Sequence, residues 1–529
     1  MTQDVDVIVI GSGPAGVSAT FPLAESGLRV LMIDRGKLPD VPPPEADFLL
    51  ARQLDPAQWK WMIGRDFHAM KMRAAVSPKL RVPSLAYSFD GFGSGNNIRG
   101  HNFITIGSLA TGGLSNAWGC GVARLSSTEL AEIPCSISDM EHSYEVVSRR
   151  IGISGKSCDD LSDYFGLDGY AQPPIPMDLL HAQLAKRYSN KRIKLHSQGF
   201  RLGRSRVAAL SEDISTRKAC NLSGNCLWGC RRRSLYSAAD DLPRLRQYEN
   251  FSELPGFLVD GVTRGSRVWR VEGQDIYGVR RSIGAKVLIL AAGTLATTRL
   301  VLRALKYEHA VPVLSSPTAA FLLWLPSLFA TQRLPGFGLG QLSFVLALST
   351  ATAFGSTFST TGIPVSEFAR HLPWRRRYGI DILRGLLGAC VVGNLFLPGH
   401  LTAGEARLNK DGALVVSGTF REAVVPLMKE AAQKLRQSYR RLGALLLPGS
   451  FTVGLPGGDV HYAGTVPMRT QPRIGESSPL GEIAGLEGVH VVDGACLPIL
   501  SEKPHTLTIM ANADRIGRKV AELQGRGVC

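Results

Sequence analysis

The chain has 529 residues, with 60 Lys or Arg against 44 Asp or Glu, so its formal net charge is +16. Hydrophobic residues make up 44% and charged residues 20%, which is globular composition and excludes a disordered chain. No glycine triplet repeat or long heptad pattern is present, which excludes collagen-like and coiled-coil proteins. The length predicts two or three structural units.

Cysteine usage and the apolar stretches bear on where the protein resides. Nine cysteines are spread along the chain, and the first residues show no signal-peptide pattern, so we expect free thiols and a cytoplasmic protein. The stretches 319–330 and 385–397 are interrupted or too short to cross a membrane, so we expect them to be buried. The positive balance favours an anionic partner, but few aromatic residues accompany it. We expect no nucleic-acid binding, and we do not favour peripheral membrane contact.

The strongest local signal lies in the first 36 residues. An apolar strand at 5–10 leads into the sequence Gly-Ser-Gly-Pro-Ala-Gly, and a helix and a second strand follow. This is the pattern of a dinucleotide-binding βαβ unit. In it, Gly11 permits the tight turn, Gly13 lets the backbone approach the pyrophosphate, and Gly16 lets the helix pack closely on the strand.

Asp34 ends the second strand, 18 residues beyond Gly16. An acid at this place accepts hydrogen bonds from the ribose hydroxyls of the adenosine, which argues against a 2′-phosphate and hence against NADP. Asp34 alone does not separate FAD from NAD.

Two later segments favour FAD. A strand at 286–290 runs into Gly293 and a helix through Leu302, and a strand at 489–492 ends in Asp493 and Gly494. Strand ends that reach one crevice from the beginning, middle and end of a chain suit a long ligand threaded through the domain. FAD is such a ligand.

Two blocks of different character separate these segments. They include expected strands at 343–353 and 413–418 and an amphipathic helix within 421–445. We predict an α/β protein whose Rossmann-type FAD-binding domain is built from discontinuous segments, with an inserted α+β substrate-binding domain. The FAD-binding domain is expected to comprise 1–125, 206–310 and 451–529, and the substrate-binding domain 126–205 and 311–450.

Five motifs together resemble the glucose–methanol–choline (GMC) flavoprotein oxidoreductases over essentially the whole chain. They are the N-terminal fingerprint, Gly112–Gly119 (GGLSNAWG), Ala291–Leu300 (AAGTLATTRL), His461–Met468 (HYAGTVPM), and the segment from Val491-Val492-Asp493-Gly494 to His505. Within the family, the chain is similar to bacterial enzymes that oxidise hydroxymethyl groups of aminoglycoside precursors such as paromamine. The resemblance implies FAD-dependent oxidation of an alcohol to a carbonyl.

The resemblance also assigns the catalytic residues. His461 is expected to take the hydroxyl proton while the hydride passes to the flavin, because an imidazole exchanges protons near neutral pH. The family places a second His or an Asn beside the first, and His505 or, one residue out of register, Pro504 occupies that place. The alternatives are a structural role for His461 and a capping or packing role for His505.

Further cofactor contacts are expected at two places. Gly112, Gly113, Ser115 and Asn116 should form a loop against the pyrophosphate and the ring edge, where Asn116 could bond the ring or the substrate oxygen; an ordinary glycine-rich turn is the alternative. Asp493 and Gly494 should contact the ribityl or pyrophosphate region, or Asp493 should cap a helix.

Cys220, Cys226 and Cys230 invite a metal interpretation. A ferredoxin-type run would need a cysteine where Ser223 stands, and no histidine at zinc-ligand spacing follows. We expect no metal site.

The favoured substrate is a sugar-like alcohol, and the electron acceptor is oxygen, giving hydrogen peroxide, or another compound. A cationic aminoglycoside conflicts with the net charge unless acids such as Asp90, Glu367 or Asp381 lie near the site. A sterol or lipid alcohol oxidase and a flavin-binding partner protein without catalysis are the alternatives.

Overall fold

The nucleotide-binding sheet is assembled from strands far apart in the sequence. The computed structural model describes residues 5–40, 42–64, 67–71, 77–364, 382–383 and 385–525. The strand order is β20 (Glu482–Ile483), β21 (Leu486–Val491), β9 (Val287–Leu290), β1 (Val7–Ile10), β2 (Val30–Asp34) and β5 (Phe251–Pro255). All neighbours are parallel except β20 and β21. β1 and β9 are buried at every position, which explains their unbroken apolar sequences.

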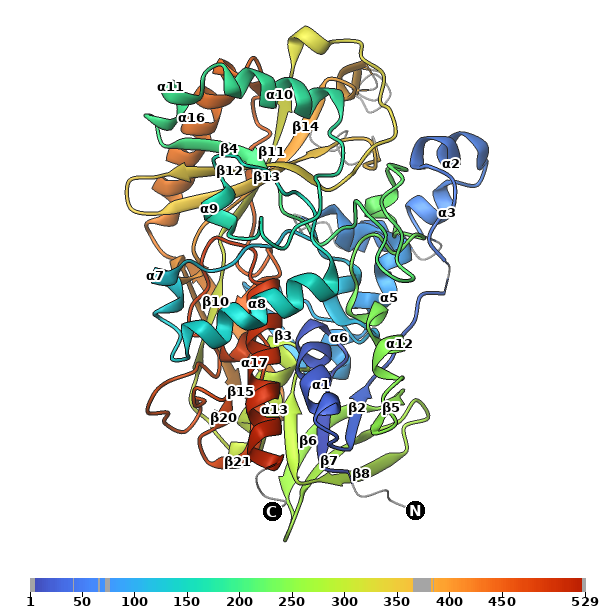
Figure 1. The fold of residues 1–529 in the computed structure, drawn as a ribbon, viewed down its shortest axis with the longest axis vertical. Coiled ribbons are helices and arrows are strands. Elements are labelled where there is room, and N and C mark those ends of the chain that lie inside the picture. The colour runs from blue at the N-terminus through green and yellow to red at the C-terminus, as the bar shows by residue number, and fades with distance from the viewer. Residues whose placement is uncertain are drawn as a thin grey trace.

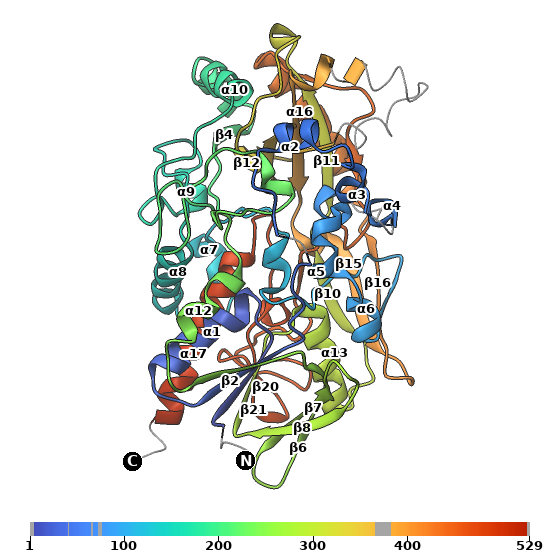
Figure 2. The same ribbon diagram turned by 90° about the vertical axis from the view of Figure 1, so that its right-hand side faces the viewer.

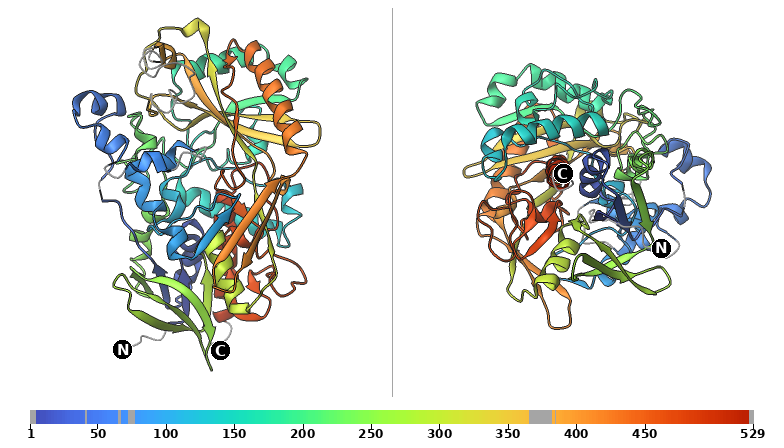
Figure 3. Two further views of the ribbon diagram at one scale, coloured as in Figure 1. Left: turned by 180° about the vertical axis from the view of Figure 1, so that it is seen from behind. Right: turned by 60° about the horizontal axis from the view of Figure 1, so that its bottom comes forward.

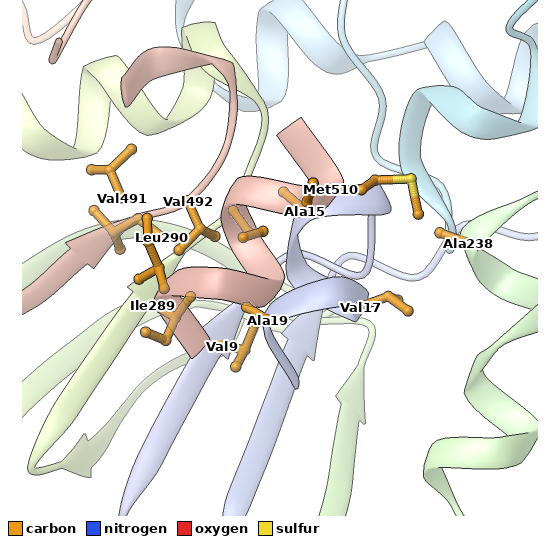
Figure 4. Packing of buried hydrophobic residues seen from close by; sticks show 14 of the residues in the cluster. Val9, Ala15, Val17, Ala19, Ala238, Ile289, Leu290, Val491, Val492 and Met510 are labelled. Carbon is orange, nitrogen blue, oxygen red and sulfur yellow. The ribbon is translucent and has the colours of Figure 1, made fainter. Parts of the chain in front are cut away.

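Helices cover both faces of this sheet. On one face α1 (Pro14–Glu25) packs against α17 (Thr506–Gly525), and α8 (Ile137–Ile151) lies beside α17 (Figure 1). On the other face lie α13 (Thr294–Leu305) and the antiparallel strands β6 (Leu258–Arg264), β7 (Trp269–Gln274) and β8 (Arg280–Ala285) (Figure 2). Figure 4 shows Ala15 and Ala19 of α1 and Met510 of α17 in one buried cluster with Val9 of β1.

The second large sheet is antiparallel and lies at the other end of the molecule (Figure 1). Its strands are β17 (Leu445–Leu446), β11 (Thr318–Trp324), β14 (Cys390–Phe396), β13 (Thr352–Ser359), β12 (Gly340–Ala347) and β4 (Phe200–Arg204), and β18 (Thr452–Val453) pairs with β11. α10 (Leu179–Ser189), α11 (Arg192–His196) and α16 (Val424–Arg441) cover it. Phe344 and Phe321 of the sheet meet Tyr439 of α16 in its core.

Strand alternation gives this sheet two different faces. On β14, Val391 and Leu395 belong to the core beneath the helices. Val392, Asn394 and Phe396, which alternate with them, line a cavity on the opposite face. The uncovered face of the sheet is therefore a wall of the cavity described below.

A five-stranded sheet joins the two ends. Its strands are β19 (Tyr462–Ala463), β10 (Val311–Ser315), β15 (Thr402–Leu408), β16 (Leu414–Phe420) and β3 (Ile98–His101). Seen from behind, β15 and β16 run as orange strands between the upper sheet and the lower one (Figure 3). Short helices complete the chain: α2 (Phe48–Leu54), α3 (Trp59–Met62), α4 (His68–Lys71), α5 (Ala86–Phe89), α6 (Phe92–Gly95), α7 (Ser127–Leu130), α9 (Ser162–Phe165) and α12 (Leu242–Leu245).

The predicted fold class is confirmed: the protein is α/β, with a Rossmann-type parallel sheet and a second domain. One element was predicted wrongly, because residues 343–353 are not one strand but part of the hairpin of β12 and β13. Ser349 lies in the turn between them, and its N–H and hydroxyl donate to Glu430 of α16. The residue boundaries of the two domains stay a prediction. Among the described residues, no helix is both long and apolar enough to cross a membrane.

Candidate active site

The loop between β1 and α1 has three glycines with three different surroundings. Gly11 has φ of +108°, and a methyl group on it would lie 2.3 Å from the carbonyl oxygen of Ala291. A methyl group on Gly16 would lie 1.9 Å from the carbonyl oxygen of Gly11, so this glycine is required for the helix to approach the strand. A methyl group on Gly13 would meet no close neighbour, because the nearest atom, the Cα of Gly113, would lie 3.9 Å from it. The space at Gly13 borders the cavity at the N-terminus of α1, a position that favours phosphate.

Asp34 ends β2 at the same loop. Its carboxylate accepts hydrogen bonds from the hydroxyl and the N–H of Ser12, the latter at 2.8 Å, and from the N–H of Gly36 at 2.5 Å. Burial raises the pKa of Asp34, although these donors favour its charged form. Asp34 lines the cavity, and its contact with a ribose stays a prediction.

The loop Gly112–Asn116 lies against Gly13. Gly113 and Ser115 border the cavity, and the hydroxyl of Ser115 donates to the carbonyl oxygen of Gly112 at 2.5 Å. Both nitrogen-bound donors of Asn116 are directed at carbonyl oxygens of this loop, Thr111 at 2.8 Å and Gly113 at 2.9 Å. Its oxygen accepts from Ser237 at 2.8 Å. The side chain of Asn116 therefore holds the loop together, and Gly112 and Asn116 lie behind the cavity lining.

Asp493 ties two strand ends together. Its Oδ2 accepts from the N–H of Gly293 at 2.9 Å and from the hydroxyl of Thr297 at 2.5 Å. Its Oδ1 accepts from the N–H of Ala495, so Asp493 also caps the 3₁₀ turn that begins at Gly494. Burial raises the pKa of Asp493 to about 6. Asp493, Gly293 and Gly494 all line the cavity, so capping and a ligand contact are compatible.

Two histidines meet at the other end of the cavity. The rings of His461 and His505 lie edge to face, with centroids 4.7 Å apart and an interplanar angle of 70°. The ring of Phe396 of β14 packs on the ring of His461, with centroids 5.2 Å apart. Pro504 also lines the cavity, and its Cγ lies 3.4 Å from the position of a methyl group on Gly121. The imidazole that packs against His461 is that of His505.

Asp459 is a site residue that the sequence analysis missed. Its Oδ2 lies 3.6 Å from Nδ1 of His461. The carboxylate accepts from the hydroxyl of Ser315 at 2.8 Å and from the N–H of Ser316 at 2.9 Å, and its side chain has no exposed surface. Burial raises the pKa of Asp459 to about 7. An acidic residue two positions before a candidate catalytic histidine is a signal that sequence inspection could have used.

Burial keeps both histidines neutral near pH 7. It lowers the pKa of His461 to about 4, and burial together with the charge of His461 lowers the pKa of His505 well below its usual value. In the described part of the chain, Nδ1 of His505 is buried without a hydrogen-bond partner, and Nε2 of His461 makes no hydrogen bond. Nε2 of His461 is therefore free to accept a proton from a ligand in the cavity.

One cavity of about 490 Å³ is lined by the glycine loop before α1, by the three aspartates and by the two histidines described above. It extends from Gly11 and Asp34 to His461 and His505, and the uncovered face of the seven-stranded sheet forms a wall. The polar residues of that wall are linked side by side: Ser205 to Ser343 at 2.8 Å, Ser343 to Ser356 at 2.9 Å, and the N–H of Ser356 to the oxygen of Asn394 at 2.9 Å. Phe354, Phe358 and Phe396 are the aromatic residues of the same wall.

The residues present fit FAD. The open space at Gly13 stands where a pyrophosphate meets the helix N-terminus, and Asp34 stands where the ribose of the adenosine would lie. The cavity continues from there to the two histidines, so a ligand held at Gly13 and Asp34 shares one cavity with them. Among the described residues, no group of three or more His, Cys, Asp or Glu side chains could hold a metal ion. The expectation of no metal site at Cys220, Cys226 and Cys230 stays a prediction.

Comparison with known proteins agrees on the fold. Residues 5–85 match a family model described as pyridine nucleotide-disulphide oxidoreductase. No curated protein matches the chain. Among solved structures, the crystal structure of pyridoxine 4-oxidase from Mesorbium loti superposes with a TM-score of 0.60 at 15% sequence identity, over 98% of this chain and 99% of that chain. The chain has the fold of that oxidase.

Proposed function

We propose that the protein is an FAD-dependent enzyme of the GMC type that oxidises an alcohol to a carbonyl compound. The observation that carries the proposal is the single cavity with a dinucleotide-binding loop at one end and the pair His461 and His505 at the other. The likeness of the fold to pyridoxine 4-oxidase, an oxidase by name, supports it.

When bound, FAD supplies the hydride acceptor. Residues of the chain bind the cofactor and accept the proton of the substrate. The N-terminus of α1 receives the pyrophosphate, and Asp34 receives the ribose hydroxyls. Nε2 of His461 accepts the proton of the substrate hydroxyl as the carbinol hydride leaves. Asp459, 3.6 Å from Nδ1, then stabilises the imidazolium that forms, and His505 contacts the substrate oxygen beside it.

The cavity favours a neutral substrate with several hydroxyl groups. Ser343, Ser356 and Asn394 offer a row of donors and acceptors that suits a sugar-like alcohol. The acids that line the cavity, Asp34, Asp459 and Asp493, are already bonded within the protein.

A cationic amino sugar is less well accommodated. Lys79 lines the same cavity, and its charge opposes a second cation, whereas Arg206, which also lines it, is paired with Asp159 and Asp168. Asp90, named above as an acid that could attract such a substrate, is exposed and lies outside the lining, while Glu367 and Asp381 are outside the described residues. We therefore favour a neutral sugar-like alcohol over an aminoglycoside precursor.

The test is a substrate screen on purified, flavin-loaded protein. Neutral polyols, amino sugars, pyridoxine and sterols are mixed anaerobically with the enzyme, and bleaching of the flavin absorbance reports hydride transfer. Peroxide release in air then separates an oxidase from a dehydrogenase, which reduces only an added dye. Bleaching by neutral polyols is expected. Bleaching by sterols alone would favour a lipid alcohol oxidase, and bound flavin that no alcohol bleaches would favour a partner protein without catalysis.

A further inference from the structure

The lining of the cavity includes a buried cation, Lys79, which has no role in the reaction proposed above. It belongs to a 3₁₀ turn at Pro78–Arg81, and only 8% of its surface is exposed. Its ammonium group donates one hydrogen bond, to the carbonyl oxygen of Trp118. An ammonium group has three donors, so two remain for a ligand in the cavity that Lys79 lines.

Among the described residues, no negative charge balances this ammonium group. In the described ranges, no carboxylate forms an ion pair with Lys79. Its titratable neighbours are cysteine thiols, and burial raises the pKa of Cys120 and of Cys226 to about 12, so both are uncharged near neutral pH. Burial without a counter-ion also lowers the pKa of Lys79 itself. A buried cation of this kind is stabilised when a ligand brings a negative charge.

Lys79 contacts the segment 113–121 through the carbonyl oxygen of Trp118, and the two ends of this segment locate Lys79 along the cavity. At one end of this segment, a methyl group on Gly113 would lie 3.1 Å from the Cα of Gly13, in the pyrophosphate loop. At the other end, Gly121 approaches Pro504, next to His505. Trp118 lies between these ends, and its indole N–H is fixed on the carbonyl oxygen of Tyr236 at 2.8 Å. Lys79 therefore stands between the phosphate end and the catalytic end, along the stretch that the flavin ring would occupy.

We propose that Lys79 supplies the positive charge that stabilises the reduced flavin ring and thereby sets its reduction potential. The inference rests on the proposed function, because it requires bound FAD. When the oxidised ring accepts a hydride, it gains two electrons and one proton and becomes negatively charged. A positive charge close to the ring makes this uptake more favourable.

Sulfite provides a readout that is independent of turnover. Its sulfur lone pair adds to the oxidised ring and leaves a negative charge on it, so sulfite affinity reports how well the site stabilises that charge. The titration is followed by flavin absorbance on holoenzyme. Lys79→Gln removes the charge, Lys79→Arg keeps it, and Lys194→Gln removes one from the exposed surface as a matched control.

We expect Lys79→Gln to raise the dissociation constant of sulfite at least about tenfold. Lys79→Arg should stay within about threefold of wild type, and Lys194→Gln should not differ from it. The two-electron midpoint potential, measured by dye equilibration, should fall by about 30 mV for each tenfold change in the equilibrium constant. If Lys79→Gln does not fold, Lys79→Met, which retains an apolar stem, takes its place.

Two results would overturn the inference in distinguishable ways. In the first, Lys79→Gln binds a full complement of flavin, and its sulfite affinity and midpoint potential equal those of wild type. This result would show that the ammonium group does not act on the ring, and it would leave the proposed FAD-dependent oxidation intact. Wild-type protein that binds no flavin removes the proposed function and this inference together.

Discussion

Gly13 can be changed in a way that separates folding from cofactor binding. The residue has φ of −70°, which an alanine adopts without strain, and the nearest atom to an added methyl group is 3.9 Å away. Gly13→Ala should therefore change the free energy of unfolding of the apoprotein by no more than about 1 kcal/mol. The methyl group would instead occupy the space through which the pyrophosphate reaches the backbone N–H groups.

The expected loss of affinity follows from the contacts displaced. A hydrogen bond to a charged group contributes about 1.5–3 kcal/mol, so losing one should weaken FAD binding about tenfold to about a hundredfold. The measurement is a titration of apoprotein with FAD, followed by quenching of flavin fluorescence. Gly16→Ala is the matched control, because its methyl group would lie 1.9 Å from the carbonyl oxygen of Gly11 and should destabilise the fold itself by about 1–3 kcal/mol. Gly13→Ala that binds FAD within threefold of wild type would refute the placement of the pyrophosphate at Gly13.

Three further predictions concern the catalytic end. His461→Ala should retain FAD yet slow anaerobic bleaching of the flavin by at least about a hundredfold, and a rate within threefold of wild type would show that His461 is not the base. His505→Ala should slow the same step about tenfold to about a hundredfold, and an unchanged rate would leave His505 a packing role. Asp459 has a pKa raised from 3.8 to about 7, so its contribution to stability is complete below about pH 4 and is lost as the pH rises towards 7. Asp459→Asn should therefore make the free energy of unfolding rise more steeply with pH between 4 and 7, by about 1.4 kcal/mol per pH unit in urea denaturation of the apoprotein, and parallel curves for the two proteins would contradict the shift.

The nucleotide-binding half of the fold could be predicted because its signals are local. The unbroken apolar runs of β1 and β9 and the glycine spacing before α1 follow from burial on both faces of a parallel sheet and from close backbone approach. The hairpin of β12 and β13 was missed because both strands have similar composition, and the short turn at Ser349 interrupts the pattern only briefly. A contact with Glu430, 81 residues away, holds that turn, and no local pattern contains it.

The difference between local sequence signals and properties of the folded chain also explains which site residues could be predicted. His461 and His505 could be named because they lie in motifs, and the structure brings their rings together. Lys79 could not, because its proposed role comes from burial with no counter-ion among the described residues, and burial is a property of the folded chain. A bond from Asn116 to the ring or the substrate oxygen was one of two expectations, and in the structure its amide N–H groups donate to carbonyl groups of its own loop.

The backbone at the catalytic end shows why the position of His461 depends on distant residues. Val460, between Asp459 and His461, has φ of +62°, a conformation that costs a β-branched residue about 1–3 kcal/mol. Such a conformation persists only where surrounding contacts offset its cost. Here the carboxylate of Asp459 is bonded to Ser315 and Ser316, and the hydroxyl of Tyr462 donates to the carbonyl oxygen of Ile104 at 2.7 Å. Because these contacts fix the residues on both sides of Val460 and His461, the imidazole is held towards the cavity before any ligand arrives. The strained backbone of Val460 and the buried carboxylate of Asp459 are thus two parts of one arrangement, in which contacts with the five-stranded sheet orient His461, the proposed base.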